Sequence, residues 1–345
     1  MAERDTRVIA HDLRDTSAPD RNLALELVRV TESAALAAAR WVGRGEKESA
    51  DQAAVDAMRF TLHAVPMDGI VVIGEGEKDE APMLYNGEQI GDGSPPQVDV
   101  AVDPLEGTRL TALGQPSALA VVALAERGSM FDPGPCVYME KMAGGSDIGD
   151  LLDLDRPLGE TLRLIAKRRG SDVSDLMLIM LDRERHADAV AQVRESGARI
   201  RFITDGDVSA ALLAVTAGTG VDLLWGIGGT PEGVLSAAAI KSMGGHLLGR
   251  LWPRDDEERQ RALDAGHDLD PDSVLSTNDL VNADDCFFVA TGITDGDLMA
   301  GVRYRAGGCT TDSLVMRSRS GTIRSIKSEH QLSKLRAFSA VDFEH

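Results

Sequence analysis

Short apolar runs that alternate with helical stretches constrain the fold of this chain more than any other feature. Three runs in the second half have the composition of buried strands: Leu176–Leu181, Arg199–Thr204 and Val221–Ile227. Stretches with a helical pattern follow them, near residues 185–196, 207–217 and 231–243. Because alternating strands and helices pack as a sheet with helices on its faces, this half predicts a mostly parallel, helix-covered sheet.

The rest of the chain predicts further helices and strands. Helices are expected over residues 20–42, where Asp20 is a candidate cap, and over residues 49–65. Apolar runs predict strands at residues 70–73, 98–102, 118–125, 286–293 and 302–326.

A chain of 345 residues is long for one simple core, so we expect two fused lobes. An N-terminal, metal-binding α+β lobe is expected over residues 20–155 and a C-terminal α/β lobe over residues 156–335. Whether the strands near residues 286–326 return toward the first lobe stays open at this point.

The charge and the cysteines exclude several kinds of protein. A formal net charge of −20 argues against a nucleic-acid partner, which would require clustered lysine and arginine to replace phosphate counterions. The acidity serves solubility or gathers carboxylates around a cation, and the two readings are compatible. Cys136, Cys286 and Cys309 are far apart, so we expect buried free thiols and neither a zinc knuckle nor a disulfide framework.

The sequence shows neither a signal peptide nor a membrane-spanning segment. Residues 1–15 alternate acids and bases and lack the apolar segment of a signal peptide. The sequence also lacks an apolar run of about 18 residues, the length needed to span a membrane. We therefore expect a cytoplasmic protein without a membrane partner.

The run Asp103-Pro-Leu-Glu-Gly-Thr108 carries the clearest chemical signal. It directly follows a predicted strand, and its two carboxylates are three residues apart, so both can converge on one side of the loop. Carboxylate oxygens are the ligands that Mg²⁺ and Mn²⁺ select. Gly107 lets the backbone at Thr108 approach a phosphate, and a helix starting at Thr108 would add a favourable dipole. Taken alone, the run is equally well an Asp-Pro turn with a capping glutamate.

Three other acidic or glycine-rich segments lie at the ends of predicted strands or at the start of a predicted helix. They are Gly74–Glu80 after a predicted strand, Asp51 near a helix start, and the glycine-rich Gly226–Gly233. Each has a purely structural alternative: a solvated acidic turn, a helix N-terminus stabilised by an acid, and a tight strand-to-helix turn. Together the four segments suggest a site for two or three cations that grips a phosphate. The sequence lacks the nucleotide-binding G-x-x-x-x-G-K-[ST] and the hydrolase G-x-S-x-G patterns.

Several segments together resemble the class II fructose-1,6-bisphosphatases. The run Asp103–Thr108 is similar to the signature loop of the lithium-sensitive, metal-dependent phosphatases, which include the inositol monophosphatases. The narrower resemblance is carried by Arg29–Ala37, Val72–Glu77, Glu80–Tyr85, Tyr138–Lys141, Asp205–Asp207, Gly226–Gly229 and Ala290–Leu298. It covers roughly residues 22–332.

The resemblance implies a fold, a reaction and partners. The fold would be a mixed α/β, layered α/β/α/β/α sugar-phosphatase fold of two fused lobes with the active site between them. The reaction would be hydrolysis of the 1-phosphate of fructose 1,6-bisphosphate to fructose 6-phosphate and phosphate, a step of gluconeogenesis. Mg²⁺ or Mn²⁺ would be the cofactor, lithium an inhibitor, and a homo-oligomer, either dimer or tetramer, the assembly.

The resemblance also assigns roles to residues. The implied metal ligands are Asp51, Glu75, Asp103, Glu106 and Glu232. The implied catalytic groups are Lys47, Asp79 and Thr108. The implied substrate contacts are Glu106, Gly107, Thr108, Tyr138, Arg183, Glu184, Arg185, Asp205, Gly206, Asp207 and Gly229.

Two alternatives to this function remain. One is another phosphatase, either a bifunctional fructose and sedoheptulose bisphosphatase or an inositol monophosphatase. The other is a regulator that binds metal and sugar phosphate without turnover. The set Lys47, Asp79 and Thr108 argues against a regulator, because binding alone would not require it.

Overall fold

Two β-sheets organise the protein in a computed structural model that describes residues 23–76 and 83–335. The eight-stranded sheet has the order β12 (Arg303–Arg305), β13 (Gly308–Arg317), β11 (Cys286–Gly292), β4 (Leu119–Glu126), β3 (Gln97–Glu106), β1 (Asp68–Ile73) and β2 (Gln89–Ile90), with β14 (Thr322–Gln331) paired to β13. The six-stranded sheet has the order β10 (Leu275–Ser276), β9 (His246–Leu251), β5 (Tyr138–Gly144), β8 (Leu223–Gly229), β6 (Met177–Leu181) and β7 (Arg199–Ile203).

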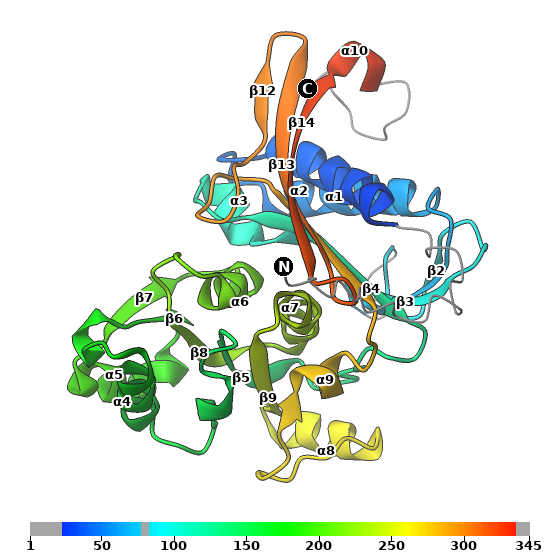
Figure 1. Ribbon diagram of the computed structural model, residues 1–345. Helices are drawn as coiled ribbons and strands as arrows, with labels where there is room; N and C mark the ends of the chain where they lie inside the picture. Colours follow the sequence, from blue (N-terminus) through cyan, green and yellow to red (C-terminus); the bar gives the residue numbers. More distant parts are fainter. Residues whose placement is uncertain (1–22, 77–82, 336–345) are drawn as a thin grey trace, which may run out of the picture.

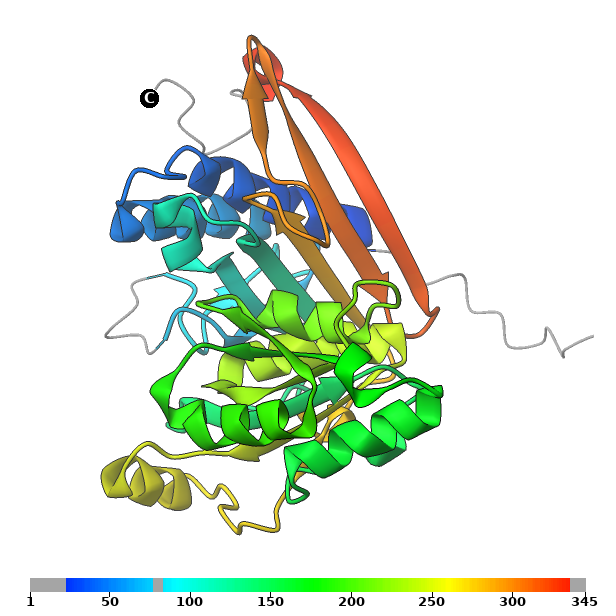
Figure 2. The same ribbon diagram turned by 90° about the vertical axis from the view of Figure 1, so that its left-hand side faces the viewer.

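Helices form three layers around these sheets (Figure 1). The longer helices are α1 (Ala24–Ala39), α2 (Lys47–Leu62), α4 (Leu158–Arg169), α5 (Ala187–Ser196), α6 (Asp207–Val215), α7 (Thr230–Met243) and α8 (Asp256–Asp264). The short ones are α3 (Thr108–Leu113), α9 (Thr277–Leu280), α10 (Leu332–Leu335), η2 (Gly149–Leu151), η3 (Val173–Asp175) and η4 (Glu184–His186). Helix α1 covers the outer face of the eight-stranded sheet, α6 and α7 lie between the sheets, and α4 and α5 cover the far side, as Figure 2 also shows. The predicted α/β/α/β/α layering is confirmed.

Helix α7 is buried on nearly all sides because it is the middle of this sandwich. It contacts β4 and β11 of one sheet and β5, β8 and β9 of the other. Its run Gly233-Val-Leu-Ser-Ala-Ala-Ala-Ile240 is entirely buried and lacks charged residues. A helix that is apolar all round can be stable only in such a place. Its N-terminal end, near Pro231 and Glu232, therefore lies between the two sheets.

The six-stranded sheet corrects one prediction. Strand β6 is parallel to β7 and β8, but β5 is antiparallel to β8 and β9, and β10 is antiparallel to β9. The expectation of a mostly parallel sheet is wrong because two strands that the sequence pattern did not reveal, β5 and β9, enter it in the opposite direction. Their glycines, small residues and charges obscure the apolar run of a buried strand.

The chain passes between the two sheets at two connections. Strand β5 lies in the six-stranded sheet, so the chain leaves the first sheet after β4, ahead of the predicted division at residue 155. It returns at β11, which pairs with β4 and β13 in the eight-stranded sheet. The predicted division into two lobes at residue 155 stays a prediction, whereas the chain changes sheets between β4 and β5 and again before β11.

Other features agree with the sequence patterns. The helices and strands expected from residues 49–65, 70–73, 98–102 and 118–125 form within a few residues of those bounds, and the candidate cap Asp20 lies outside the described residues. All three cysteines are buried free thiols, as predicted. Within the described ranges, a bilayer-spanning helix is absent, because every helix is too short or too polar.

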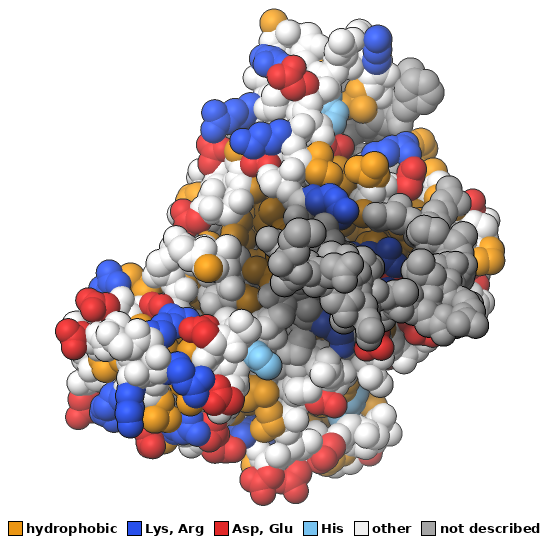
Figure 3. All heavy atoms as spheres, in the orientation of Figure 1, with side chains coloured by type: hydrophobic (Ala, Val, Ile, Leu, Met, Phe, Trp, Pro, Cys, Tyr) orange, Lys and Arg blue, Asp and Glu red, His pale blue; other side chains and the backbone are white. Residues whose placement is uncertain are grey.

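The surface mixes charges of both signs. Figure 3 shows basic and acidic side chains interspersed over the region of α4 and α5. Some of these groups are paired, as Arg168 is with Asp150 and Arg169 with Asp147, each at 2.7 Å. Such exposed pairs add little stability, so their contribution is mainly to solubility.

Candidate active site

The loop between β3 and α3 places two carboxylates at the edge of the eight-stranded sheet. Asp103 and Glu106 lie in the last four residues of β3, where Leu105 N–H donates to Asp103 Oδ1 at 3.1 Å and fixes the local backbone. Gly107 then adopts φ 90°, and an added Cβ would lie 2.9 Å from Leu110 Cδ1. A side chain at this position would be strained, so glycine allows Thr108 to begin α3 immediately after the strand.

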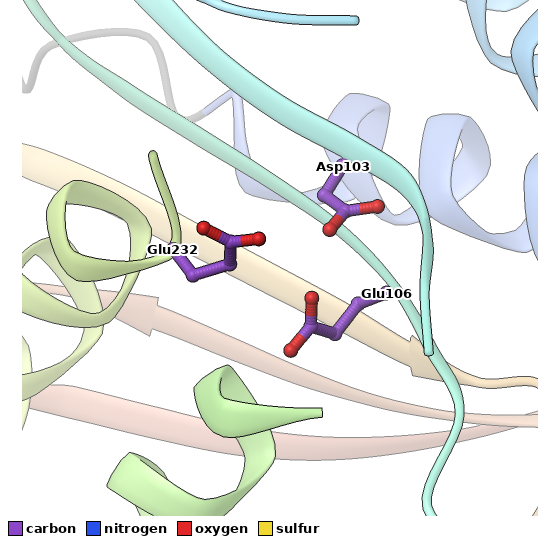
Figure 4. Close-up of side chains that lie close together, drawn as sticks. All are labelled: Asp103, Glu106 and Glu232. Carbon is purple, nitrogen blue, oxygen red and sulfur yellow. The ribbon is translucent and has the colours of Figure 1, made fainter. Parts of the chain in front are cut away.

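A third carboxylate comes from the other sheet. Glu232 lies in the first turn of α7, after the end of β8. A Cβ at Gly229 would lie 1.7 Å from Glu232 Oε2, so a larger residue at this position would displace the carboxylate from its present place. Figure 4 shows Glu232 facing Asp103 and Glu106, and ligand oxygens of the three residues lie within 4.8 Å of one another.

These three carboxylates line a cavity of about 260 Å³ between the sheets. Asp51 of α2 and Glu75, which follows β1, line the same cavity, together with Thr108 and Asp205. The structure thus brings together all five residues that were predicted as metal ligands, from elements that are far apart in the sequence.

Burial and mutual repulsion raise the pKa values of these carboxyls. Burial raises the pKa of Glu75 to about 8, with Asp103, Asp51 and Glu232 adding like-charge repulsion. Burial is also the main reason that the pKa of Asp103 rises to about 6 and that of Glu232 to about 7. The pKa of Glu106 is well above its ordinary value, chiefly through burial and next through the charge of Asp103. Ionising all of these carboxyls together is therefore energetically unfavourable in the absence of a cation.

The donor set fits a divalent cation. Glu232 Oε2 is buried and lacks a hydrogen-bond partner among the described residues, although an ionised oxygen requires one. Glu106 Oε1, by contrast, accepts from the Val208 backbone N–H at 3.0 Å, which fixes its orientation. Oxygen-only ligands of this kind select hard cations such as Mg²⁺ and Mn²⁺ over softer metals. A bound dication would relieve the repulsion and satisfy the orphaned oxygen.

A second cavity of about 250 Å³ adjoins the first and shares Asp205, Pro231 and Glu232 with it. Its other lining residues include Tyr138 at the start of β5, Arg183 and Arg185 after β6, Asp207 at the start of α6, and Gly229 at the end of β8. The pair of cavities therefore offers carboxylates at one end and guanidinium groups at the other.

The two arginines of this second cavity are held by backbone carbonyls. Arg185 donates to the Ile227 carbonyl through Nη2 at 2.6 Å and Nε at 3.2 Å, and lies 5.1 Å from the Tyr138 ring. Arg183 donates to the carbonyls of Asp182 and Thr204, each at 2.9 Å. Partial burial lowers the pKa of Arg185 from its usual range, and it stays charged at neutral pH.

Some predicted residues lie elsewhere. Lys47 is exposed at the start of α2 and does not line either cavity. Glu184 is exposed and is absent from the lining of the second cavity, although its neighbours Arg183 and Arg185 belong to it. Gly206 is buried with φ 85° and caps α6, where it places Asp205 and Asp207. Asp79 lies outside the described residues.

Lys141 of β5 binds two residues that line the second cavity, and it was not among the predicted site residues. It is buried, and its Nζ donates to Asp207 Oδ2 at 2.5 Å and to the Gly229 carbonyl at 2.9 Å. The available signal was a lysine within the largely apolar segment Met139–Gly144, which is unusual unless the charge is paired.

A layered α/β protein with a carboxylate cavity beside an arginine-bearing pocket has the site of a phosphatase that acts on a sugar phosphate. The family model described as "Bacterial fructose-1,6-bisphosphatase, glpX-encoded" matches residues 21–330. The chain therefore belongs to the bacterial, glpX-encoded fructose-1,6-bisphosphatase family.

Two curated relatives span almost the whole chain. The D-fructose 1,6-bisphosphatase class 2/sedoheptulose 1,7-bisphosphatase of Synechococcus sp. (strain JA-3-3Ab) is 44% identical over 335 residues, covering 90% of this chain and 96% of the relative. The fructose-1,6-bisphosphatase 1 class 2 of Escherichia coli (strain K12) is 45% identical over 325 residues, covering 91% of this chain and 96% of the relative.

Proposed function

We propose that the chain hydrolyses the 1-phosphate of fructose 1,6-bisphosphate, giving fructose 6-phosphate and phosphate. The observation that carries this proposal is the pair of adjoining cavities, one lined by six carboxylates, including all five predicted metal ligands, and the other by two arginines. A bisphosphate has two anionic ends, and only one of them is to be cleaved. Carboxylates that bind cations suit the reacting end, whereas guanidinium groups suit the end that stays intact.

Mg²⁺ or Mn²⁺ is the proposed cofactor, held by Asp51, Glu75, Asp103, Glu106 and Glu232. When bound, such ions polarise a phosphoryl group and lower the pKa of a coordinated water. The five carboxylates would hold the ions, and the Val208 N–H that binds Glu106 would keep that ligand in place.

Thr108 is the proposed group that orients the attacking water. Thr108 lines the carboxylate cavity, and among the described residues its hydroxyl makes only a long contact, 3.5 Å, with the Leu105 carbonyl, so it is available to a water. In-line displacement requires that a nucleophile be held opposite the leaving sugar oxygen. Asp79 is the proposed proton acceptor, and Lys47 the proposed group that stabilises developing charge.

The second cavity would hold the rest of the substrate. Arg183 and Arg185 would bind the distal phosphate, because a planar guanidinium donates paired hydrogen bonds to phosphate oxygens. Asp205 and Asp207 would accept hydrogen bonds from sugar hydroxyls. Tyr138 and Gly229 would form part of the wall of this pocket, and Gly206 would place Asp205 and Asp207 at the start of α6. Gly107 would allow the phosphate to approach the α3 backbone. Glu184 was expected to contact the substrate, and this role stays a prediction for an exposed residue outside the lining of the pocket.

A bifunctional enzyme is the second candidate. The Synechococcus relative carries both fructose and sedoheptulose bisphosphatase in its name, and the seven-carbon substrate is also a bisphosphate. An inositol monophosphatase is not favoured, because its substrate would leave the arginine pocket unused.

The remaining expectations concern the cell. We expect a homo-oligomer, either a dimer or a tetramer, in the cytoplasm, with inhibition by lithium through competition at one cation position. Light scattering on the full chain would give the mass of the assembly as a multiple of one chain.

The experiment that tests the proposed substrate is a comparison of phosphate release. Fructose 1,6-bisphosphate, sedoheptulose 1,7-bisphosphate and an inositol monophosphate are each supplied with Mg²⁺ or Mn²⁺. We expect release from fructose 1,6-bisphosphate at the highest kcat/KM and little from inositol monophosphate. A preference for the monophosphate would contradict the proposal.

A further inference from the structure

Among the described residues, Lys141 is the only buried lysine or arginine. It lies on β5, a strand with neighbours on both sides, and its side chain contacts α6 at Asp207 and lies against α7 at Gly233. The ammonium bridges two other elements, since Asp207 begins α6 and Gly229 ends β8. Burying a charge is costly unless it is paired, so this contact must be closely fitted.

The surrounding residues are adapted to this ammonium. A Cβ added at Gly228 would lie 2.2 Å from Asp207 Oδ2 and 3.2 Å from Lys141 Nζ. A Cβ at Gly233 would lie 3.3 Å from Lys141 Cδ. Side chains at either glycine would displace the lysine or its partner, so the glycines are part of the same arrangement.

The charge of Lys141 also reaches the carboxylate cavity. Lys141 Nζ lies 2.9 Å from the Gly229 carbonyl, and Gly229 lies directly against the Glu232 carboxylate, since a Cβ added there would lie 1.7 Å from Glu232 Oε2. The ammonium is therefore close enough for its charge to act on the acidic cluster. The lysine does not line either cavity, so it would not touch the substrate or a cation. Its influence passes through Asp207 and through the Gly229 carbonyl.

We propose that Lys141 is a positioning residue that holds the Asp207 carboxylate in the sugar pocket and partly neutralises the acidic cluster behind it. The inference rests on the proposed function, because the pocket is taken to hold the sugar. It gives the buried lysine two measurable effects. Removing the ammonium should weaken substrate binding, because Asp207 loses its orientation. It should also strengthen the binding of divalent cations, because the cluster becomes more negative.

The test compares Lys141→Met with the parent chain and with a matched control. Methionine has a similar length and no charge. The control is Lys241→Met, since Lys241 Nζ also makes two hydrogen bonds, to Asn278 Oδ1 at 2.7 Å and to the Val281 carbonyl at 3.0 Å, away from both cavities. For Lys141→Met we expect KM for fructose 1,6-bisphosphate to rise by about tenfold, with a smaller change in kcat. For Lys241→Met we expect a lower melting temperature at most.

Calorimetric titration of the metal-free variants with Mn²⁺ supplies a readout that needs no turnover. Lys141→Met should bind Mn²⁺ at least about threefold more tightly than the parent, and Lys241→Met should match the parent. If the parent does not hydrolyse fructose 1,6-bisphosphate, the proposed function fails, whereas this titration still reports on Lys141. Parent values of both KM and Mn²⁺ affinity in a folded Lys141→Met chain would overturn the proposal.

A double-mutant cycle covers the case in which Lys141→Met does not fold. Asp207→Asn removes the partner, and the double variant Lys141→Met/Asp207→Asn leaves no unpaired buried charge. If Lys141 acts through Asp207, the double variant should have the KM of Asp207→Asn alone. A further rise in KM on adding Lys141→Met would mean that the lysine acts independently of Asp207, contrary to the proposal.

Discussion

At the scale of single residues, the chemistry of the site depends on which polar groups lack hydrogen-bond partners in the described structure. Thr108 has a hydroxyl that lines the cavity and lacks a short hydrogen bond within the described structure, and Glu232 has a buried oxygen without a partner. In contrast, His186 is committed on both sides, since Nδ1 contacts the Leu181 carbonyl at 2.9 Å and Nε2 accepts from Ile227 N–H at 3.0 Å. Thr108 and Glu232 can therefore bind a water or a cation, whereas both ring nitrogens of His186 are already occupied.

The Thr108 hydroxyl gives the first prediction. Thr108→Ala should lower kcat by roughly a hundredfold or more, because general acid–base assistance is typically worth that much. Its KM should change much less, and Thr108→Ser should keep part of the activity. Steady-state phosphate release measures both constants.

Thr111→Ala is the matched control for this prediction. Thr111 lies in the same helix, but its buried hydroxyl has no hydrogen-bond partner among the described residues and faces the core. We expect this variant to keep the parent kcat. An unchanged kcat in Thr108→Ala would remove the hydroxyl from the mechanism.

At the scale of elements, the site is built from the ends of strands and the starts of helices. The turn from β3 to α3 supplies Asp103 and Glu106, and the turn from β8 to α7 supplies Glu232. The loop after β6 carries Arg183 and Arg185 into the adjoining pocket. Because these junctions come from both sheets, the geometry of the site depends on how the middle helices hold the sheets together.

Arg185 carries the prediction at this scale. Arg185→Ala should raise KM for fructose 1,6-bisphosphate by about tenfold or more, since a charged hydrogen bond contributes roughly 1.5–3 kcal/mol. Its kcat should fall less than that of Thr108→Ala, and the preference for the bisphosphate over a sugar 1-monophosphate should narrow. Exposed Arg194 on α5 offers the control Arg194→Ala, with an expected KM equal to the parent value. If Arg185→Ala keeps both KM and preference, the distal phosphate is bound elsewhere.

The sequence revealed strands where apolar residues run unbroken and missed them where the site interrupts the run. Residues 98–102 and 118–125 were recognisable because both lie in the centre of a sheet and are almost wholly apolar. Strand β5 was not, because Glu140 and Lys141 break its apolar pattern. A paired charge within a buried strand is a tertiary feature, and a local pattern cannot reveal its partner.

At the scale of the whole molecule, the cavity joins residues from most of the chain's length. Asp51, Asp103 and Glu232 are remote in sequence and meet only because α7 packs between the two sheets. Glycine-rich and acidic segments indicated the participants, but the sequence alone could not show which of them share a cavity. Lys47 and Glu184 illustrate the limit, since neither lines a cavity in the described part of the chain and their predicted roles stay predictions.

The charge stored in the cavity predicts how the metal-free chain responds to pH. The folded-state pKa values of about 8 for Glu75, about 7 for Glu232 and about 6 for Asp103 exceed their ordinary values of 4.5 for Glu and 3.8 for Asp. The folded chain therefore holds more protons than the unfolded chain between about pH 4 and pH 8, so its stability falls as pH rises through that window.

Thermal unfolding measures this effect. The melting temperature of the chelator-treated chain should decrease from about pH 5.5 to about pH 8.5, and Mn²⁺ should restore it most at the higher pH, because cations bind the deprotonated carboxylates. A melting temperature that is constant or rises with pH in the metal-free chain would mean that these carboxyls do not repel one another in the fold.

The carboxylate cavity is proposed to make the chain a cation-dependent fructose-1,6-bisphosphatase. The most direct measurement is the rate of phosphate release from fructose 1,6-bisphosphate by the chain after treatment with EDTA, with and without added Mg²⁺ or Mn²⁺. We expect no turnover in excess EDTA and recovery when either cation is restored, since without cations the carboxylates repel the substrate phosphate. Full turnover in excess EDTA would contradict the proposal.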